Sequence, residues 1–227
     1  MTKQMLLASA VVLAVSASAS AAIVASWSIP TAVPAATTGT NYVYGAADAG
    51  DAAAGTSLSA FHALAATTWS SPSGNGSSFS LSSNNWSVGV YYQVTVSTNG
   101  YSDIYLAWDQ TRSGTGPSSF RVDMSTDGTN FTTILASYSI IQAGLAGTNT
   151  LAWSIANGVQ SAFTTTVASI AGADNQSSLT FRFVNLSTVA TGGTNRIDNI
   201  VVSSGPIPAP GALALLGLAG LAARRRR

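Results

Sequence analysis

The sequence predicts an all-β fold, an antiparallel sandwich of two sheets with a hydrophobic helix at each end of the chain. Between residues 90 and 202, short segments alternate apolar and polar residues with a period of two, which is typical of half-buried strands. Turn residues separate these segments about every 8–12 residues, as in antiparallel sandwiches. Residues 22–205 contain no Lys or Glu but much Gly, Ser, Thr and Asn, a composition that disfavours long helices.

The 227 residues divide into an N-terminal segment 1–21, a central domain 22–205 and a C-terminal segment 206–227. The central domain is long enough to bury one sizeable core. The chain has no cysteine, so core packing rather than disulfides must stabilise this domain. Four arginines and eight aspartates give the domain a net charge of −4. The absence of a basic cluster argues against a nucleic-acid partner.

The N-terminal segment has the parts of a secretory signal peptide: a charged start at Lys3, an apolar helix over 5–15, and small residues before a cleavage site. Ala19 and Ala21 match the pattern that signal peptidase recognises, which places the mature N-terminus at Ala22. The alternative is a permanent membrane anchor. The apolar run gives a helix of only about 16 Å, whereas the hydrocarbon core of a bilayer is about 30 Å thick.

The C-terminal segment combines prolines, a short apolar stretch and a basic end. Pro208 and Pro210, on either side of Ala209, favour an extended and accessible chain. Residues 211–223 give an apolar helix of about 20 Å, which is short for a permanent span. The chain then ends in Arg224, Arg225, Arg226 and Arg227. These arginines should stay on the cytoplasmic side, so we expect transient membrane insertion.

This segment resembles the PEP-CTERM sorting signal, which has a Pro-x-Pro motif, a short Leu/Ala/Gly helix and a terminal Arg cluster. The motif here runs from Pro208 to Gly211, and Ala209 stands where the family has Glu. The resemblance covers only residues 206–227. It implies processing by an exosortase-type enzyme in the inner membrane of a Gram-negative bacterium that makes extracellular polysaccharide. A simple tail anchor without processing is the alternative.

The central domain begins with two predicted strands, 23–28 and 42–44, and with segment 57–66, whose pattern fits a short helix or a strand. Residues 70–78 are expected to form a loop. Further strands are predicted at 90–97, 104–108, 120–124, 131–135, 179–183 and 197–202. Asn99–Gly100 and Asp127–Gly128 supply turns. The expected core residues are Ile104, Leu106, Trp108, Phe120, Val122, Phe181 and Phe183.

Two runs in this domain add a second resemblance. The run from Tyr91 to Thr133 is similar to domains that often precede PEP-CTERM signals. The closing run RIDNIVV, residues 196–202, is similar to the last strand of jelly-roll carbohydrate-binding modules. These similarities imply a jelly-roll-like sandwich and do not specify a ligand.

Charged and aromatic side chains on the polar phase of the strands form a candidate ligand face. The candidates are Trp86, Tyr91, Tyr105, Arg121, Asp123 and Arg182, with Asp109 as a further member. The charged groups would bind sugar hydroxyls, and the aromatic rings would stack on sugar rings. Cross-strand ion pairs on a solvated face explain the same charges without any ligand.

No metal, cofactor or catalytic centre is expected. Asp198 and Asn199 carry oxygen atoms that suit calcium, but such a pair more often bonds to neighbouring backbone at a strand entry. His62 is the only histidine, is expected to be a half-buried packing residue, and no G-x-S-x-G motif surrounds a serine. With no Glu in the chain, a glycosidase would need two aspartates, and no pair stands out.

These features predict a non-enzymatic protein that is secreted or displayed on the cell surface. Its expected partners are signal peptidase, an exosortase-type enzyme and extracellular polysaccharide. A carbohydrate-binding module with a defined glycan ligand is the first alternative. A secreted Asp-dependent hydrolase is the second.

Overall fold

The computed structural model of the protein describes residues 21–144 and 152–206. Both predicted terminal helices, together with Ala19, the Pro208–Gly211 motif and the Arg cluster, lie outside the described residues. Within the described part of the chain, no helix is long and apolar enough to cross a membrane.

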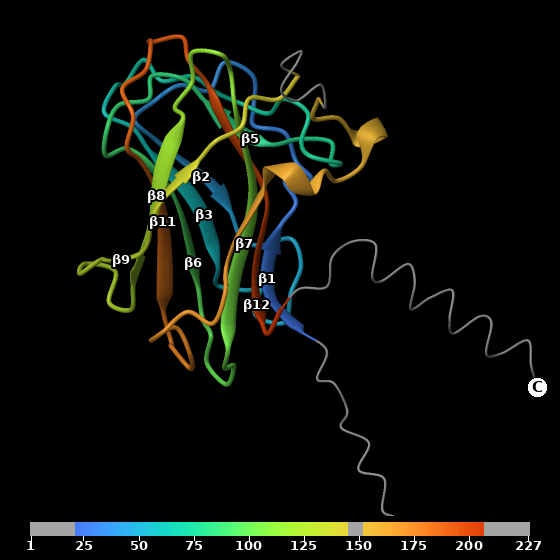
Figure 1. The fold of residues 1–227 in the computed structure, drawn as a ribbon, viewed down its shortest axis with the longest axis vertical. Coiled ribbons are helices and arrows are strands. Elements are labelled where there is room, and N and C mark those ends of the chain that lie inside the picture. Colours follow the sequence, from blue (N-terminus) through green and yellow to red (C-terminus); the bar gives the residue numbers. More distant parts are fainter. Residues whose placement is uncertain (1–20, 145–151, 207–227) are drawn as a thin grey trace, which may run out of the picture.

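Twelve strands and two single-turn 3-10 helices make up the regular structure of the described residues (Figure 1). The strands are β1 (Ala22–Trp27), β2 (Asn41–Gly45), β3 (Ser57–Phe61), β4 (Trp69–Ser70), β5 (Leu81–Ser83), β6 (Tyr91–Val96), β7 (Ile104–Arg112), β8 (Ser119–Ser125), β9 (Thr132–Ser139), β10 (Thr164–Val167), β11 (Leu179–Asn185) and β12 (Asn195–Ser204). The 3-10 helices are η1 (Ile155–Asn157) and η2 (Ser161–Phe163).

The strands form two antiparallel sheets that pack face to face. The first sheet has the order β10-β7-β12-β5-β4, and β1 also pairs with β12. The second sheet has the order β2-β3-β6-β11-β8-β9. The sequence prediction of an antiparallel β-sandwich is therefore confirmed.

Eight of the strands follow the connectivity of a jelly roll. Taken in chain order as β1, β6, β7, β8, β9, β10, β11 and β12, they form the sheets β1-β12-β7-β10 and β6-β11-β8-β9. The first strand of this set lies beside the last, and only β8 and β9 follow each other within one sheet. The remaining strands are additions: β2 and β3 extend the second sheet beyond β6, while β5 pairs with β12 and β4 with β5.

The core lies between the two sheets and is built from the apolar phase of the strands. In β6, for example, Tyr92 and Val94 are buried, whereas Tyr91 and Gln93 are half-buried on the opposite face. All seven core residues expected from the sequence are 0% exposed: Ile104, Leu106, Trp108, Phe120, Val122, Phe181 and Phe183.

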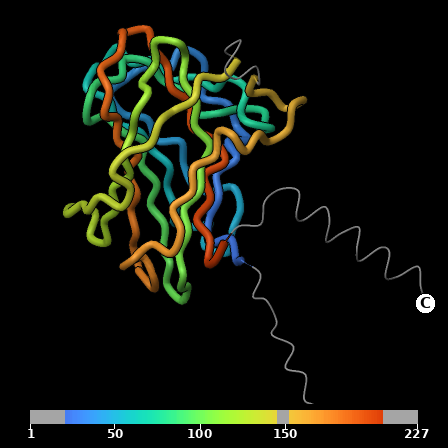
Figure 2. The backbone as a smooth tube through the Cα atoms, in the orientation of Figure 1, coloured from blue at the N-terminus to red at the C-terminus, as the bar shows by residue number. Residues whose placement is uncertain are grey.

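The two ends of the described domain lie side by side. Ala22 at the start of β1 pairs with Ser204 at the end of β12. Figure 2 shows the blue start and the red end of the described chain meeting at the same end of the sandwich. The segments that precede and follow the domain are therefore attached next to one another.

The structure also resolves what the sequence left open or missed. Segment 57–66 begins as a strand, β3, and turns irregular after Phe61. Strand β9 starts at Thr132 and extends to Ser139, beyond the predicted 131–135. The sequence did not predict β4, β5 and β10, because strands of two to four residues are too short to show an alternating pattern.

Candidate functional site

The outward side of the second sheet is a continuous surface that we call the open face. Strand register aligns its side chains in two rows across the sheet. The first row is Val43, Ser59, Gln93, Arg182, Asp123 and Thr133. The second row is Asn41, Phe61, Tyr91, Val184 and Arg121. Phe131, just before β9, lies against this surface through its contact with Arg182.

Aromatic rings and one guanidinium group form the centre of the open face. The rings of Phe61 and Tyr91 lie with their centroids 5.0 Å apart. The Arg182 Cζ atom lies 4.4 Å from the Tyr91 centroid and 3.7 Å from the Phe131 centroid, so the guanidinium makes two cation–π contacts. Its Nε donates a hydrogen bond of 2.8 Å to Gln93 Oε1. These contacts fix the position of the Arg182 head group.

An ion pair between Arg121 and Asp123, both on β8, lies next to Arg182 on β11. Arg121 Nε donates to both carboxylate oxygens of Asp123, at 3.0 and 2.9 Å. Thr133 Oγ1 donates to Asp123 Oδ1 at 2.7 Å. The Asp123 side chain is only 9% exposed, whereas that of Arg121 is 38% exposed. The carboxylate is thus held within the protein, and the guanidinium remains accessible.

The structure brings four of the six predicted ligand-face residues onto the open face: Tyr91, Arg121, Asp123 and Arg182. The prediction is wrong for Trp86, which is 4% exposed and packs edge-on against His62, Tyr92 and Phe120. Trp86 precedes β6 in an irregular segment that folds over the end of the core, where no alternation indicates its direction.

Tyr105 is also misplaced by the prediction, because it belongs to β7 in the first sheet. Its hydroxyl lies 3.3 Å from Ser169 Oγ, far in the fold from the aromatic centre of the open face. Conversely, sequence analysis missed Phe61, Gln93 and Phe131 as members of the face. Phe61 belongs to the face because it pairs with Tyr91 across β3 and β6, and the sequence does not reveal this strand register.

The outward side of the first sheet is covered, and it contains a buried Asp cluster formed by Asp109 and Asp198 with their hydrogen-bond donors. Asp198 Oδ2 accepts from Asn75 N at 2.8 Å and from Ser77 Oγ at 2.6 Å, and its Oδ1 accepts from Asn199 N at 2.8 Å. Burial, with repulsion from Asp109, raises the pKa of Asp198 to about 7.

Asp109 is bonded in the same way, so its predicted place on a ligand face is wrong. Its Oδ2 accepts from the side-chain amides of Asn75 and Asn199, each at 2.8 Å, and its Oδ1 accepts from Thr164 Oγ1 at 2.5 Å. Gly74 is required nearby, because a Cβ there would lie 2.3 Å from Asp198 Oδ2. The geometry agrees with the hydrogen-bonding interpretation of Asp198 and Asn199. Among the described residues, no group of three or more His or Asp side chains could hold a metal ion.

His62 is a buried packing residue, more enclosed than the half-buried position expected from the sequence. Its ring lies edge-on to Trp69 and Trp86, and Nε2 lies 3.1 Å from Ser83 Oγ. Burial lowers the pKa of His62 to about 4, so the ring is neutral at neutral pH. Although it contacts a serine, the pair is closed off from solvent, because Ser83 is buried as well.

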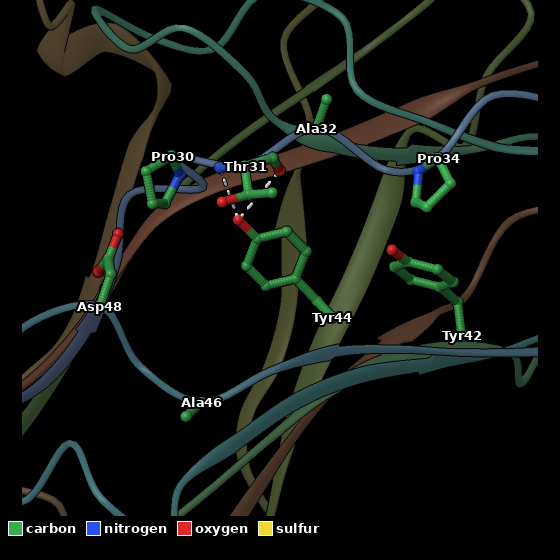
Figure 3. A pocket seen from close by; sticks show the side chains of 8 residues that line it. All are labelled: Pro30, Thr31, Ala32, Pro34, Tyr42, Tyr44, Ala46 and Asp48. Carbon is green, nitrogen blue, oxygen red and sulfur yellow. Dashed lines mark hydrogen bonds between the residues drawn. The ribbon is translucent and has the colours of Figure 1, made fainter.

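A groove of about 390 Å³ lies beside the edge strand β2 (Figure 3). It is lined by Pro30, Thr31, Ala32, Pro34, Tyr42, Tyr44, Ala46 and Asp48. The Tyr44 hydroxyl donates to Thr31 O and accepts from Thr31 N, both at 3.1 Å. Asp48 accepts from Ser28 N and Oγ. The Tyr44 hydroxyl and the Asp48 carboxylate of the groove are therefore already hydrogen-bonded within the protein.

Comparison with known proteins gives distant structural similarities only. No family model and no curated protein matches the chain. The CBM22-1–GH10 modules of the Clostridium thermocellum xylanase 10B, solved with xylohexaose, are 12% identical with a TM-score of 0.43, covering 83% of this chain and 29% of that chain. The K3 cleaved adhesin domain of Lys-gingipain from Porphyromonas gingivalis is 16% identical with a TM-score of 0.43, covering 81% of this chain and 100% of that domain.

A CBM4 structure is 10% identical with a TM-score of 0.39, covering 78% of this chain and 97% of that chain. The present chain spans less than a third of the xylanase structure, 29% of its length. Similarities of this size identify neither a family nor a ligand. The connectivity and the site define the class: a jelly-roll β-sandwich with one covered outer face and one open, aromatic outer face.

Proposed function

We propose that this protein is an exported, non-enzymatic glycan-binding protein whose binding site is the open face. The observation that carries this proposal is the group of three half-buried aromatic rings near Arg182. Sugar rings combine apolar C–H faces with hydroxyl groups, so they are bound by aromatic surfaces beside polar side chains. Phe61, Tyr91 and Phe131 supply the rings, while Gln93 and Arg182 supply hydrogen-bonding groups.

The open face suits a ligand better than the groove beside β2 does. In the groove, Tyr44 and Asp48 already bond to Thr31 and Ser28. On the open face, the terminal nitrogens of Arg182 make no hydrogen bond within the described residues. A ligand there would gain hydrogen bonds without breaking existing ones.

Binding to a polysaccharide microarray tests this proposal, using the protein purified from an exporting host. Tyr91→Ala should weaken binding about tenfold or more, since a buried aromatic contact and the support of Arg182 are both lost. Tyr105→Ala is the matched control, because it removes the same side chain from the other sheet. Equal binding by both variants, or no binding of the wild type to any polysaccharide, would refute the proposal.

A surface or matrix protein without a glycan ligand is the second candidate. The Arg121–Asp123 pair favours it, since this pair satisfies two of the face's three charges internally. A secreted Asp-dependent hydrolase has less support. Asp109 and Asp198 are close enough to interact, but both are buried and hydrogen-bonded under a loop.

We further propose that signal peptidase cleaves before Ala22 and that an exosortase-type enzyme processes residues 206–227. Strand β1 begins at Ala22 and β12 ends at Ser204, so neither cleavage would remove a residue from a described strand. The intact mass of the natively exported protein tests both cleavages together. Material that still contains Met1 or the four terminal arginines would contradict the proposal.

A further inference from the structure

The open face has an unusual electrostatic character for this domain. The strands of the second sheet carry three charged residues, Arg121, Asp123 and Arg182, which give the sheet a local charge of +1. The remainder of the central domain is acidic, because its two arginines and seven aspartates give it a net charge of −5. The sheet that carries the aromatic rings thus has a net positive charge within an acidic domain.

Arg182 is positioned to accept an anion. A guanidinium has five N–H donors, and the bond to Gln93 uses only the one on Nε. Neither terminal nitrogen donates a hydrogen bond among the described residues. The rings of Tyr91 and Phe131 hold the group in place, so little side-chain entropy remains to be lost on binding. The two terminal nitrogens match the two oxygens of a carboxylate.

Arg112 and Arg121 are less suited to this role, and Arg196 lies on β12 in the other sheet, away from the aromatic rings. Arg112 donates to the backbone oxygens of Ile140, Ser113 and Gly114, so it stabilises a loop connection. Arg121 spends its Nε on Asp123, but its terminal nitrogens lie one strand away from Arg182 and add positive potential.

We propose that the open face selects an acidic polysaccharide, with the anionic group of one sugar paired to Arg182 and a neighbouring sugar against Phe61 and Tyr91. This inference rests on the glycan-binding function proposed above and names its ligand class. Because the domain as a whole is acidic, its overall field repels a polyanion. Selection must therefore come from the local guanidinium groups, whose field is effective within about 8 Å at physiological salt.

Affinity measurements with three polymers test the inference: polygalacturonate, the same polymer with its carboxyl groups reduced to alcohols, and a sulfated polysaccharide. Polygalacturonate should bind at least about tenfold more tightly than its reduced form, as expected for a charge-assisted hydrogen bond. Preference for the sulfated polymer over polygalacturonate would identify sulfate as the recognised group. Arg182→Gln should abolish the preference for the acidic polymer.

Two further variants separate charge from fold. Arg196→Gln removes the same charge from β12 in the other sheet and should keep the preference. Arg182→Lys keeps the charge but cannot donate two parallel hydrogen bonds to one carboxylate, so it should retain only part of the preference for the acidic polymer. This variant also provides the test if Arg182→Gln does not fold. Equal binding of polygalacturonate and its reduced form by the wild type would overturn the inference while leaving glycan binding intact. Absence of binding to every polysaccharide would overturn the proposed function itself.

Discussion

Both outer faces of the sandwich carry charged side chains, but the surroundings of these side chains differ between the two faces. On the first sheet, Asp109 and Asp198 are buried beside segments that include Asn75 and Gln160, and each of their carboxylate oxygens accepts a hydrogen bond. On the second sheet, Arg182 lies on an uncovered surface between aromatic rings and keeps free donors. The comparison shows that the carboxylates beneath the covering segments are fully hydrogen-bonded within the protein, whereas the Arg182 guanidinium on the uncovered sheet keeps donors that no described residue uses.

The largest expected effect comes from uncovering the first sheet. Asn75→Ala removes hydrogen bonds to Asp109 and to the backbone oxygen and nitrogen of Gln160. Leaving buried groups unpaired should lower the free energy of unfolding by about 3–5 kcal/mol. Chemical denaturation measures this loss. Gln93→Ala on the open face is the control and should lower it by no more than about 1 kcal/mol; similar losses for the two variants would contradict the distinction between the faces.

A pH dependence should come from the same cluster. Because the folded-state pKa of Asp198 is raised to about 7, the unfolded chain loses this proton first as the pH rises. The contribution of Asp198 to the free energy of unfolding should therefore fall between about pH 4 and pH 7, by roughly 2–4 kcal/mol, and then stay level. Buried His62, whose pKa is lowered to about 4, has the opposite effect, because the unfolded chain binds its proton more tightly up to about pH 6.5.

Urea denaturation at a series of pH values measures this slope. Asp198→Asn lacks the titrating group but keeps His62, so the wild type should lose stability relative to this variant as the pH rises from 4 to 7. A difference in stability between the wild type and Asp198→Asn that stays constant from pH 4 to pH 7 would show that the Asp198 carboxylate is not held under a strong desolvation penalty.

The smallest expected effect is on the open face. Arg121→Gln removes an ion pair whose arginine is partly exposed, so it should lower the free energy of unfolding by about 1 kcal/mol or less. Thr133 still donates to Asp123 in this variant. A loss of several kcal/mol in thermal or chemical denaturation would mean that this face, too, is mainly structural.

The sequence predicted the frame of the fold well, because the core strands are long enough to alternate. The seven residues of β7, β8 and β11 that were expected in the core are all buried. The jelly-roll arrangement came from resemblance rather than from periodicity, and the strand connectivity confirms it. The export and sorting segments stay predictions, because they lie outside the described residues.

The functional site was only partly predictable, for two physical reasons. Asp109 has the outward phase of an exposed residue, but a loop 34 positions earlier in the chain covers it through Asn75. Long-range contacts of this kind leave no local pattern. Phe61 joins Tyr91 only because β3 pairs with β6 in one particular register. The direction of Trp86 could not be inferred either, since it lies in a segment without regular structure.

Hydrogen–deuterium exchange of the purified protein, with and without a saturating polysaccharide ligand, would show whether the open face or another surface binds the glycan. If the open face is the binding site, exchange should be slower around Phe61, Tyr91 and Phe131 and unchanged around Tyr42 and Tyr44. Protection confined to the groove beside β2, with the open face unchanged, would contradict it.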